Sequence, residues 1–139
     1  MNLSAVEARD RFTGSPVARL ATADKAGVPH VVPITFVVDG DVIVFAIDHK
    51  PKRTTKLRRL RNISENPAVS VIVDHYADDW SSLWWARADG WAELRESGDS
   101  RQMAVQLLRQ KYRQYEDASP PGAVVAIHVT TWSGWAFAG

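Results

Sequence analysis

Short apolar runs, several alternating with polar residues, recur along most of the chain, and this pattern predicts a mainly β protein. Such runs, bounded by Gly, Pro, Asn or Asp, are typical of strands. We expect strands at residues 17–22, 29–38, 42–47, 68–73, 83–95 and 123–132. Asp39-Gly40-Asp41 is typical of a tight hairpin turn, which indicates antiparallel pairing of its flanking strands. Pro33 favours an edge strand or a bulge, and Asp89-Gly90 predicts a second bulge or bend.

Three other segments have the spacing of helices. Ser4-Ala-Val-Glu7 is a capping-box pattern, which predicts a short helix running to about residue 12. Pro51 suits the first turn of a second, basic helix that ends near Asn62. Residues 100–115 place apolar and aromatic side chains on one helical face. We therefore predict an α+β fold, mainly β, with about six strands around a small barrel and about three short helices.

Length and composition are those of an ordinary globular protein. A chain of 139 residues predicts a single domain over residues 1–139. The absence of cysteine excludes disulfides, thiolate metal sites and cysteine nucleophiles. The N-terminal residues carry charges where a signal peptide has an apolar run, and no apolar run approaches the ~20 residues of a membrane span. We expect a cytoplasmic protein with no membrane partner.

Charge is concentrated in one segment. Residues 50–62 hold seven positive charges and no negative charge, whereas the whole chain has a net charge of only +1. A helix N-terminus with hydroxyl and cationic side chains can bind a phosphate, although a solvated helix face explains the charge equally well. A nucleic-acid surface is a third interpretation. Because aromatic residues for base stacking are not interleaved with these charges, we expect no nucleic-acid partner.

Candidate catalytic groups are not apparent. His30, His49, His75 and His128 lie on different predicted elements, so we expect no metal site. The chain has no GxSxG, P-loop or GxGxxG motif. Asp78-Asp79 is predicted to be a solvated pair in a loop. We therefore assign no catalytic residue and expect that any chemistry comes from a bound cofactor.

Tryptophan is abundant near two parts of the chain. The six tryptophans are Trp80, Trp84, Trp85, Trp91, Trp132 and Trp135. Aromatic surfaces can line a pocket for a ring system or form a dimer interface, but we expect ordinary core packing for Trp91 and Trp132. Trp84 and Trp85 are consecutive on a strand, so their side chains point to opposite faces. One of the two can face the core, and the other a pocket or partner.

The order of motifs along the chain resembles a known superfamily. A strand with LAT, a turn with G-x-P-H, a strand with VP-x-x-F, a hairpin, a basic helix start and N-P are together similar to pyridoxamine 5′-phosphate oxidase-like proteins. DHKPK…LRRLRN, LWW-x-R-x-DG and the closing WSGW resemble the branch of F420-dependent enzymes from actinobacteria. The resemblance covers nearly the whole chain. It implies a six-stranded antiparallel split β-barrel that forms a homodimer with two cofactor sites between the subunits.

The resemblance also implies which residues bind the cofactor. The cofactor phosphate would lie at the start of the basic helix, against Lys50, Lys52, Arg53, Thr54, Lys56 and Arg59. The ring system would lie along Pro33, Ile34, Thr35 and Phe36, and the second subunit would contribute Trp85. The arginine and serine pattern that binds the substrate of true pyridoxamine phosphate oxidases is not recognisable, so we do not expect that activity.

The expected function is an F420-dependent oxidoreductase, a reductase that transfers hydride to a small organic acceptor. Coenzyme F420 carries a phosphate and an oligoglutamate tail, and this greater negative charge suits the basic segment better than FMN does. Hydride moves directly between ring and acceptor, so the protein need only bind, orient and exclude water. The alternatives are an FMN-dependent enzyme of the same fold and a non-catalytic protein that binds F420, flavin or heme. For heme, His49 or His75 would be the ligand to test.

Overall fold

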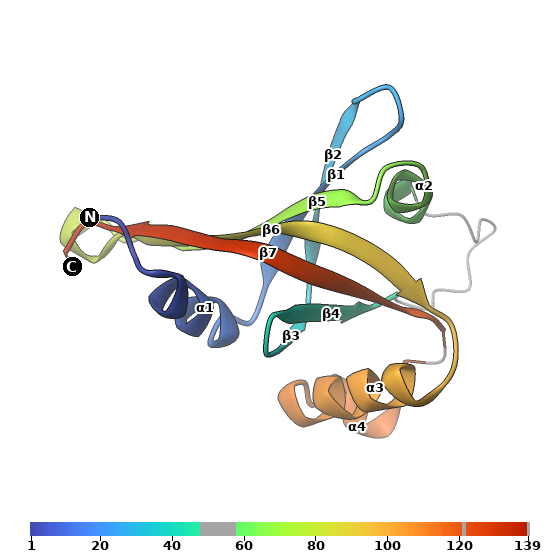
Figure 1. Ribbon diagram of the computed structural model, residues 1–139. Helices are drawn as coiled ribbons and strands as arrows, with labels where there is room; N and C mark the ends of the chain where they lie inside the picture. The colour runs from blue at the N-terminus through green and yellow to red at the C-terminus, as the bar shows by residue number, and fades with distance from the viewer. Residues whose placement is uncertain (48–57, 121, 139) are drawn as a thin grey trace.

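The chain folds around one curled antiparallel sheet. The computed structural model describes residues 1–47, 58–120 and 122–138, and its seven strands have the order β2-β1-β5-β6-β7-β4-β3 (Figure 1). The strands are β1 (Ala18–Ala23), β2 (Pro29–Ile34), β3 (Val37–Asp39), β4 (Val42–Ala46), β5 (Ala68–His75), β6 (Trp84–Arg95) and β7 (Val124–Ala136). The helices are α1 (Ala5–Thr13), α2 (Arg58–Glu65), α3 (Asp99–Lys111), α4 (Gln114–Asp117) and the 3₁₀ turn η1 (Trp80–Ser82).

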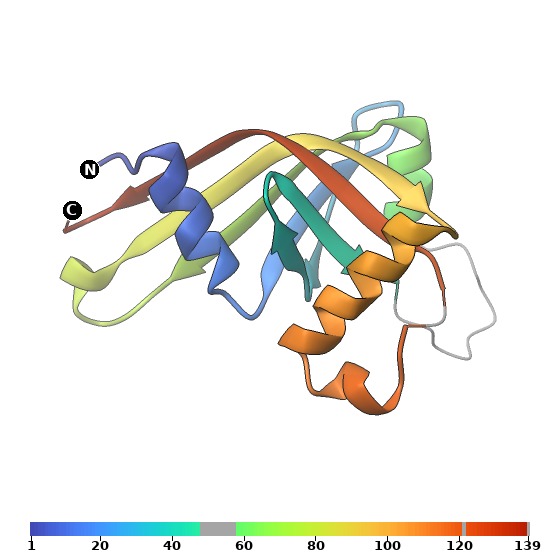
Figure 2. The same ribbon diagram turned by 60° about the horizontal axis from the view of Figure 1, so that its bottom comes forward.

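The two edges of the sheet are neighbours in the chain. Edge strand β2 leads into edge strand β3 through Thr35 and Phe36 alone, so the sheet has to curl towards a barrel (Figure 2). The sequence predicted one strand over residues 29–38, and the structure divides it in two. Six predicted strands therefore become seven, because the backbone of Phe36 is hydrogen-bonded to the hydroxyl of Tyr112 at this point.

The long strands β6 and β7 curve along their length, and a bulge interrupts their pairing (Figure 1). The register shifts between Asp89 and Gly90, as predicted. A Cβ atom at Gly90 would lie 2.1 Å from the carbonyl oxygen of His128, so no larger residue fits this close approach. β7 continues to Ala136, beyond the predicted end at residue 132.

The core fills the inner side of the curled sheet. Its largest fully buried side chains include Phe12, Phe36, Phe45, Leu20, Ile43 and Ile127. α1 begins with the predicted capping box and places Phe12 in this core. The Phe12 ring meets Phe36 at 5.2 Å and Trp132 at 5.5 Å between centroids, in both cases edge to face. The predicted core packing of Trp132 is thus confirmed.

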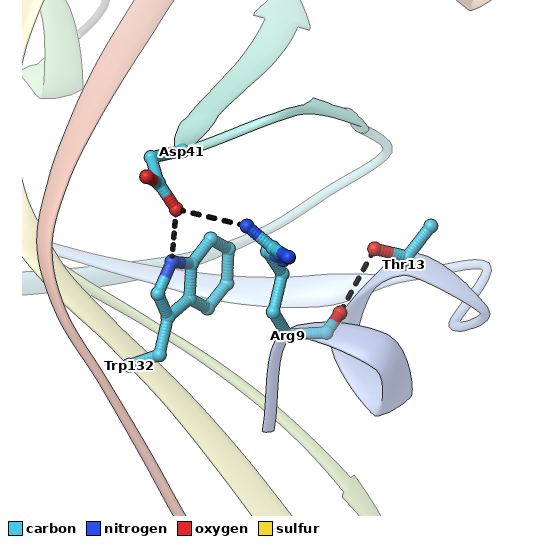
Figure 3. Close-up of polar contacts among 4 residues, drawn as sticks. All are labelled: Arg9, Thr13, Asp41 and Trp132. Atoms are coloured by element: carbon cyan, nitrogen blue, oxygen red, sulfur yellow. Dashed lines mark hydrogen bonds and ion pairs between the residues drawn. The ribbon is translucent and has the colours of Figure 1, made fainter. Parts of the chain in front are cut away.

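A polar contact joins α1, the β3–β4 turn and β7. The Oδ1 atom of Asp41 accepts hydrogen bonds from Trp132 Nε1 at 2.9 Å and from Arg9 Nη1 at 3.3 Å (Figure 3). The hydroxyl of Thr13 donates to the carbonyl of Arg9 at 2.8 Å. The ion pair is largely exposed and adds little stability, so its role is to fix where α1 lies on the hairpin.

Trp91 departs from the prediction. Its side chain is 44% exposed and stacks on His128, with ring centroids 4.1 Å apart. It pairs with His128 on the outer face of β6 and β7, whereas the neighbouring pair Ala92 and Ile127 points into the core. The predicted core packing of Trp91 is therefore wrong.

The third predicted helix is divided into α3 and α4, so the described residues form four α-helices instead of about three. Tyr112, directly after α3, has extended backbone angles (φ −118°, ψ 120°) that end the helix. α3 covers the outer side of β4 and β7. Its residues Ala104, Val105 and Leu108 pack there against Val44, Ala46 and Val124.

α2 is fixed to β1 by a buried polar pair. The side-chain amide of Asn62 donates to the hydroxyl of Thr22 at 3.0 Å, and both residues are buried. The helix ends at Glu65, three residues later than predicted, just before Asn66-Pro67. Proline disfavours helical backbone in the residue before it, which accounts for this end.

None of the helices described has the length and apolar character needed to cross a membrane.

Candidate functional site

One hollow lies where the end of β2 meets α2. We call it the strand cleft, and it has a volume of about 220 Å³. It is lined by Val17, Pro33, Ile34, Thr35, Ala46 and Arg59. Ile34 and Ala46 are buried at its base, whereas Pro33 and Thr35 are exposed. The cleft therefore combines an exposed strand end with a guanidinium group.

The position of Arg59 follows from how α2 docks. Arg59 precedes Asn62 by three residues, so the two lie one turn apart on neighbouring parts of the helix surface. The buried bond from Asn62 to Thr22 holds this turn against β1. Arg59 is half-buried at the cleft, whereas Arg58 and Arg61 of the same helix are exposed.

A second hollow, which we call the aromatic cavity, lies towards the far end of β5, β6 and β7. It has a volume of about 370 Å³. Its lining consists of Ile72, Asp74, His75, Tyr76, Leu83, Trp84, Trp85, Arg87 and Trp135. Trp85 pairs with Trp135 on the outer face, and Trp84 points to the inner side, where it packs against the core. The prediction that Trp84 and Trp85 face opposite sides is confirmed.

The two hollows are connected by one cross-strand row of side chains. Pro33 of the strand cleft pairs with Arg19, and Arg19 also pairs with Ile72 of the aromatic cavity. On its other side, Ile72 pairs with Arg87. Neighbouring strands lie about 4.8 Å apart, so Pro33 and Ile72 are separated by roughly 10 Å. Arg19 and Arg87 are exposed, and Arg87 is bonded to Asp89 at 3.0 Å. Pro33 of one hollow and Ile72 and Arg87 of the other thus lie along one face of the sheet.

The structure brings together part of the predicted cofactor site. Pro33, Ile34, Thr35 and Arg59 line the same cleft. Trp85 lines the aromatic cavity instead, at the other end of the connecting row. Lys50, Lys52, Arg53, Thr54 and Lys56 lie outside the described residues.

Three residues at or beside the site were missed from the sequence. Val17 and Ala46 line the strand cleft, and Arg19 lies beside Pro33 on the neighbouring strand. Strand alternation in residues 17–22 could have placed Arg19 on the outer face. Its position opposite Pro33 depends on the register of β1 and β2, which no local pattern specifies.

The residues of the strand cleft fit part of a phosphorylated ring cofactor. The Arg59 guanidinium is a bidentate donor suited to phosphate, and exposed backbone at Pro33–Thr35 suits a flat polar ring. Pockets for such ligands measure about 300–1,000 Å³, so the cleft of one chain is too small to enclose the whole molecule. Within the part of the chain that the structure describes, no three His, Asp or Glu side chains are grouped to bind a metal ion.

Comparison with protein families now adds to this geometry. Residues 5–136 match the family described as pyridoxamine 5′-phosphate oxidase. The chain belongs to this family. The superfamily predicted from the motifs is thereby confirmed, and the match covers nearly all of the chain. Comparison by sequence with curated proteins gives no match.

Solved structures share the split-barrel fold of the pyridoxamine 5′-phosphate oxidase family. A conserved hypothetical protein from Mycobacterium tuberculosis has a TM-score of 0.78 at 19% identity, covering 97% of this chain and 86% of that one. A FAD-binding protein from Mesorhizobium loti has a TM-score of 0.72 at 24% identity, covering 96% and 95%. The heme storage protein HutZ from Vibrio cholerae has a TM-score of 0.73 at 17% identity, covering 94% and 92%. At these identities the likeness confirms the predicted split barrel and no finer property.

Proposed function

We propose that this protein is a cytoplasmic oxidoreductase that binds coenzyme F420 in the strand cleft and reduces a small organic acceptor. The observation that carries the proposal is the meeting of Pro33, Ile34 and Thr35 with Arg59 around one cleft. When bound, reduced F420 supplies the hydride. The protein's own residues bind the phosphate, orient the ring and exclude water from it.

Charge favours F420 over FMN. Arg59 lines the cleft and would bind the phosphate, and Arg58 lies on the same helix with an exposed side chain. Arg19 adds another exposed cation beside Pro33. FMN needs cations for one phosphate, whereas the oligoglutamate tail of F420 carries further carboxylates that these arginines can attract. Lys50, Lys52, Arg53, Thr54 and Lys56 remain predicted contributors to the same anion site.

A homodimer would complete the site. The strand cleft of one chain is too small for the whole cofactor, and the outer face at the aromatic cavity carries Ile72, Trp85 and Trp135. We propose that a second copy packs on this face and that its Trp85 closes the cofactor site, as the family resemblance implies. Aromatic residues of this kind are enriched at interfaces between proteins.

Flavin and heme binding are the alternatives. An FMN-dependent enzyme would use the same cleft, and the FAD-binding protein from Mesorhizobium loti shows that the fold accepts a flavin. Heme has one specific observation in its favour, because His75 lines the aromatic cavity together with Trp84 and Trp85. HutZ from Vibrio cholerae is described as a heme storage protein of this fold. If the His75→Ala variant still binds heme, then His75 is not the heme ligand.

The phosphate assignment is tested by a titration of F420 fluorescence with wild type, Arg59→Gln and Arg61→Gln. Arg61→Gln is the matched control because it removes the same charge from the same helix, at an exposed position that does not line the cleft. A charge-assisted hydrogen bond contributes about 1.5–3 kcal/mol, so Arg59→Gln should raise the Kd roughly 10- to 100-fold. The control should change it less than about threefold, as expected for a screened surface charge. Equal effects of both variants would refute the assignment.

A further inference from the structure

The hydroxyl of Tyr112 joins two segments that are far apart in the sequence. It accepts a hydrogen bond from the backbone N–H of Phe36 at 2.9 Å. Its own proton is shared between the carbonyl oxygens of Pro16 at 2.8 Å and Phe36 at 2.9 Å. One side chain thus hydrogen-bonds the backbone of two segments: the loop before β1 and the connection between β2 and β3.

We call these two segments the walls; they lie side by side where the β1–β2 pair ends, and both contribute to the lining of the strand cleft. Val17 follows Pro16 directly, and Thr35 precedes Phe36 directly, and both Val17 and Thr35 line the cleft. Ala46, at the base, packs with the α3 residues Ala104, Val105 and Leu108. α3 and the residue that follows it therefore contact three segments of the chain that contribute to the cleft lining.

Lys111 reinforces the same contact. Its Nζ atom donates to the carbonyl of Ser15 at 2.8 Å and lies 3.9 Å from the centre of the Phe36 ring, in a cation–π contact. Ser15 and Phe36 are the neighbours of Pro16 and Thr35, so the ammonium group joins the same two segments as Tyr112.

Half-burial of these polar groups has an energetic cost, and burial lowers the pKa of Lys111 to about 8 and raises that of Tyr112. An apolar pair would pack here without that cost, but it could not hydrogen-bond the backbone of both walls.

We infer that Tyr112 and Lys111 are positioning residues that fix the two walls of the strand cleft in the arrangement which the cofactor ring requires. The ligand's identity rests on the proposed function, whereas the wall contacts themselves do not. Neither side chain lines the cleft, so both act through the backbone of the segments that do. Holding the walls in advance reduces the ordering that binding would otherwise require, which raises affinity.

The test uses Tyr112→Phe, with Tyr115→Phe as the matched control. Tyr115 is the neighbouring aromatic ring, 6.0 Å from Tyr112 between centroids, in the same packing cluster. Two quantities are measured on each protein: the amide exchange rate of Phe36 without ligand, and the Kd values for F420 and FMN. Thermal melting verifies that each variant folds.

Loss of the Tyr112 hydroxyl should speed Phe36 amide exchange at least about tenfold, because this N–H loses its acceptor. It should weaken F420 and FMN by a similar factor of about tenfold, since the ring wall and not the phosphate site is loosened. The control should change neither quantity. Unchanged Phe36 exchange, or faster exchange with unchanged Kd values, would overturn the inference.

If the proposed function is wrong, the two measurements give a different combination of results. If wild type binds neither cofactor, the proposed function is refuted while amide exchange still decides whether Tyr112 fixes the walls. Faster Phe36 exchange in Tyr112→Phe alone would then support the wall contacts, and unchanged exchange would overturn them. Should Tyr112→Phe fail to fold, Lys111→Met, which keeps the apolar stem, takes its place, and unchanged Kd values in this variant would then overturn the inference.

Discussion

The pair Asn62 and Thr22 should contribute to stability as a unit. Their hydrogen bond is 3.0 Å long, and the residues are only 2% and 4% exposed. Asn62→Ala removes this bond and leaves the Thr22 hydroxyl buried without it. Removing one partner of such a bond and leaving the other buried and unsatisfied costs about 1–3 kcal/mol. We therefore expect Asn62→Ala to lower the free energy of unfolding by about 1–3 kcal/mol.

A double-mutant cycle isolates the contribution of the bond itself. Thr22→Val leaves the Asn62 amide unpaired and should cost about 1–3 kcal/mol on its own. The double variant leaves no unpaired group from this bond, so its loss should fall short of the sum of the single losses by about 1 kcal/mol or more. Urea unfolding followed by circular dichroism measures all four proteins. Strictly additive losses would refute the assignment of this bond as the contact that fixes α2.

The same pair should affect the candidate site. Because Asn62 fixes the helix turn that carries Arg59, Asn62→Ala should weaken F420 binding even at temperatures where the variant is fully folded. Thr22→Val should have the same effect in smaller measure, since Asn62 keeps its packing. Wild-type affinity in a folded Asn62→Ala protein would show that α2 does not depend on this contact.

Three further predictions concern other parts of the fold. Gly90→Ala should lower the free energy of unfolding by more than about 4 kcal/mol or prevent folding, because its Cβ would lie 2.1 Å from the His128 carbonyl oxygen. A Cβ at Gly122 would meet nothing within 4 Å, so the control Gly122→Ala should melt like wild type. Burial lowers the pKa of Lys111 to about 8 from 10.5, so between these pH values the unfolded chain binds more protons and the free energy of unfolding should rise with pH. Lys111→Met should flatten this rise, and equal slopes in urea titrations would contradict it. Ile72→Lys places a third cation between Arg19 and Arg87, so light scattering should report a monomer, and a persistent dimer would exclude the outer face as the interface.

Strands and their bulge could be predicted because each depends on a local pattern. Alternation and turn residues placed every strand except for the division between β2 and β3, and Asp89-Gly90 marked the shift between β6 and β7. The division of one predicted strand at Thr35–Phe36 could not be predicted, because its cause is a tyrosine 76 residues away in sequence. Tyr112 equally explains why the third helix ends early.

The family motifs predicted candidate site residues, whereas a residue whose place depends on strand register was missed. Arg59 and Pro33 were paired by resemblance, and the fold brings both to one cleft. Arg19 reaches the site only through its register with Pro33 and Ile72, which sequence spacing does not reveal. Trp91 was placed in the core on hydrophobicity alone, although its strand position turns it outwards to His128.

Equilibrium titration of the purified wild-type protein with F420 and, in parallel, with FMN tests the central claim most directly. The account predicts micromolar or tighter binding of F420 and much weaker binding of FMN, because the arginines around the strand cleft favour the more anionic cofactor. This preference should shrink at high salt as the charges are screened. Tighter binding of FMN would make the protein a flavin enzyme of the same fold. Binding of neither cofactor would contradict the assignment of the strand cleft as a cofactor site.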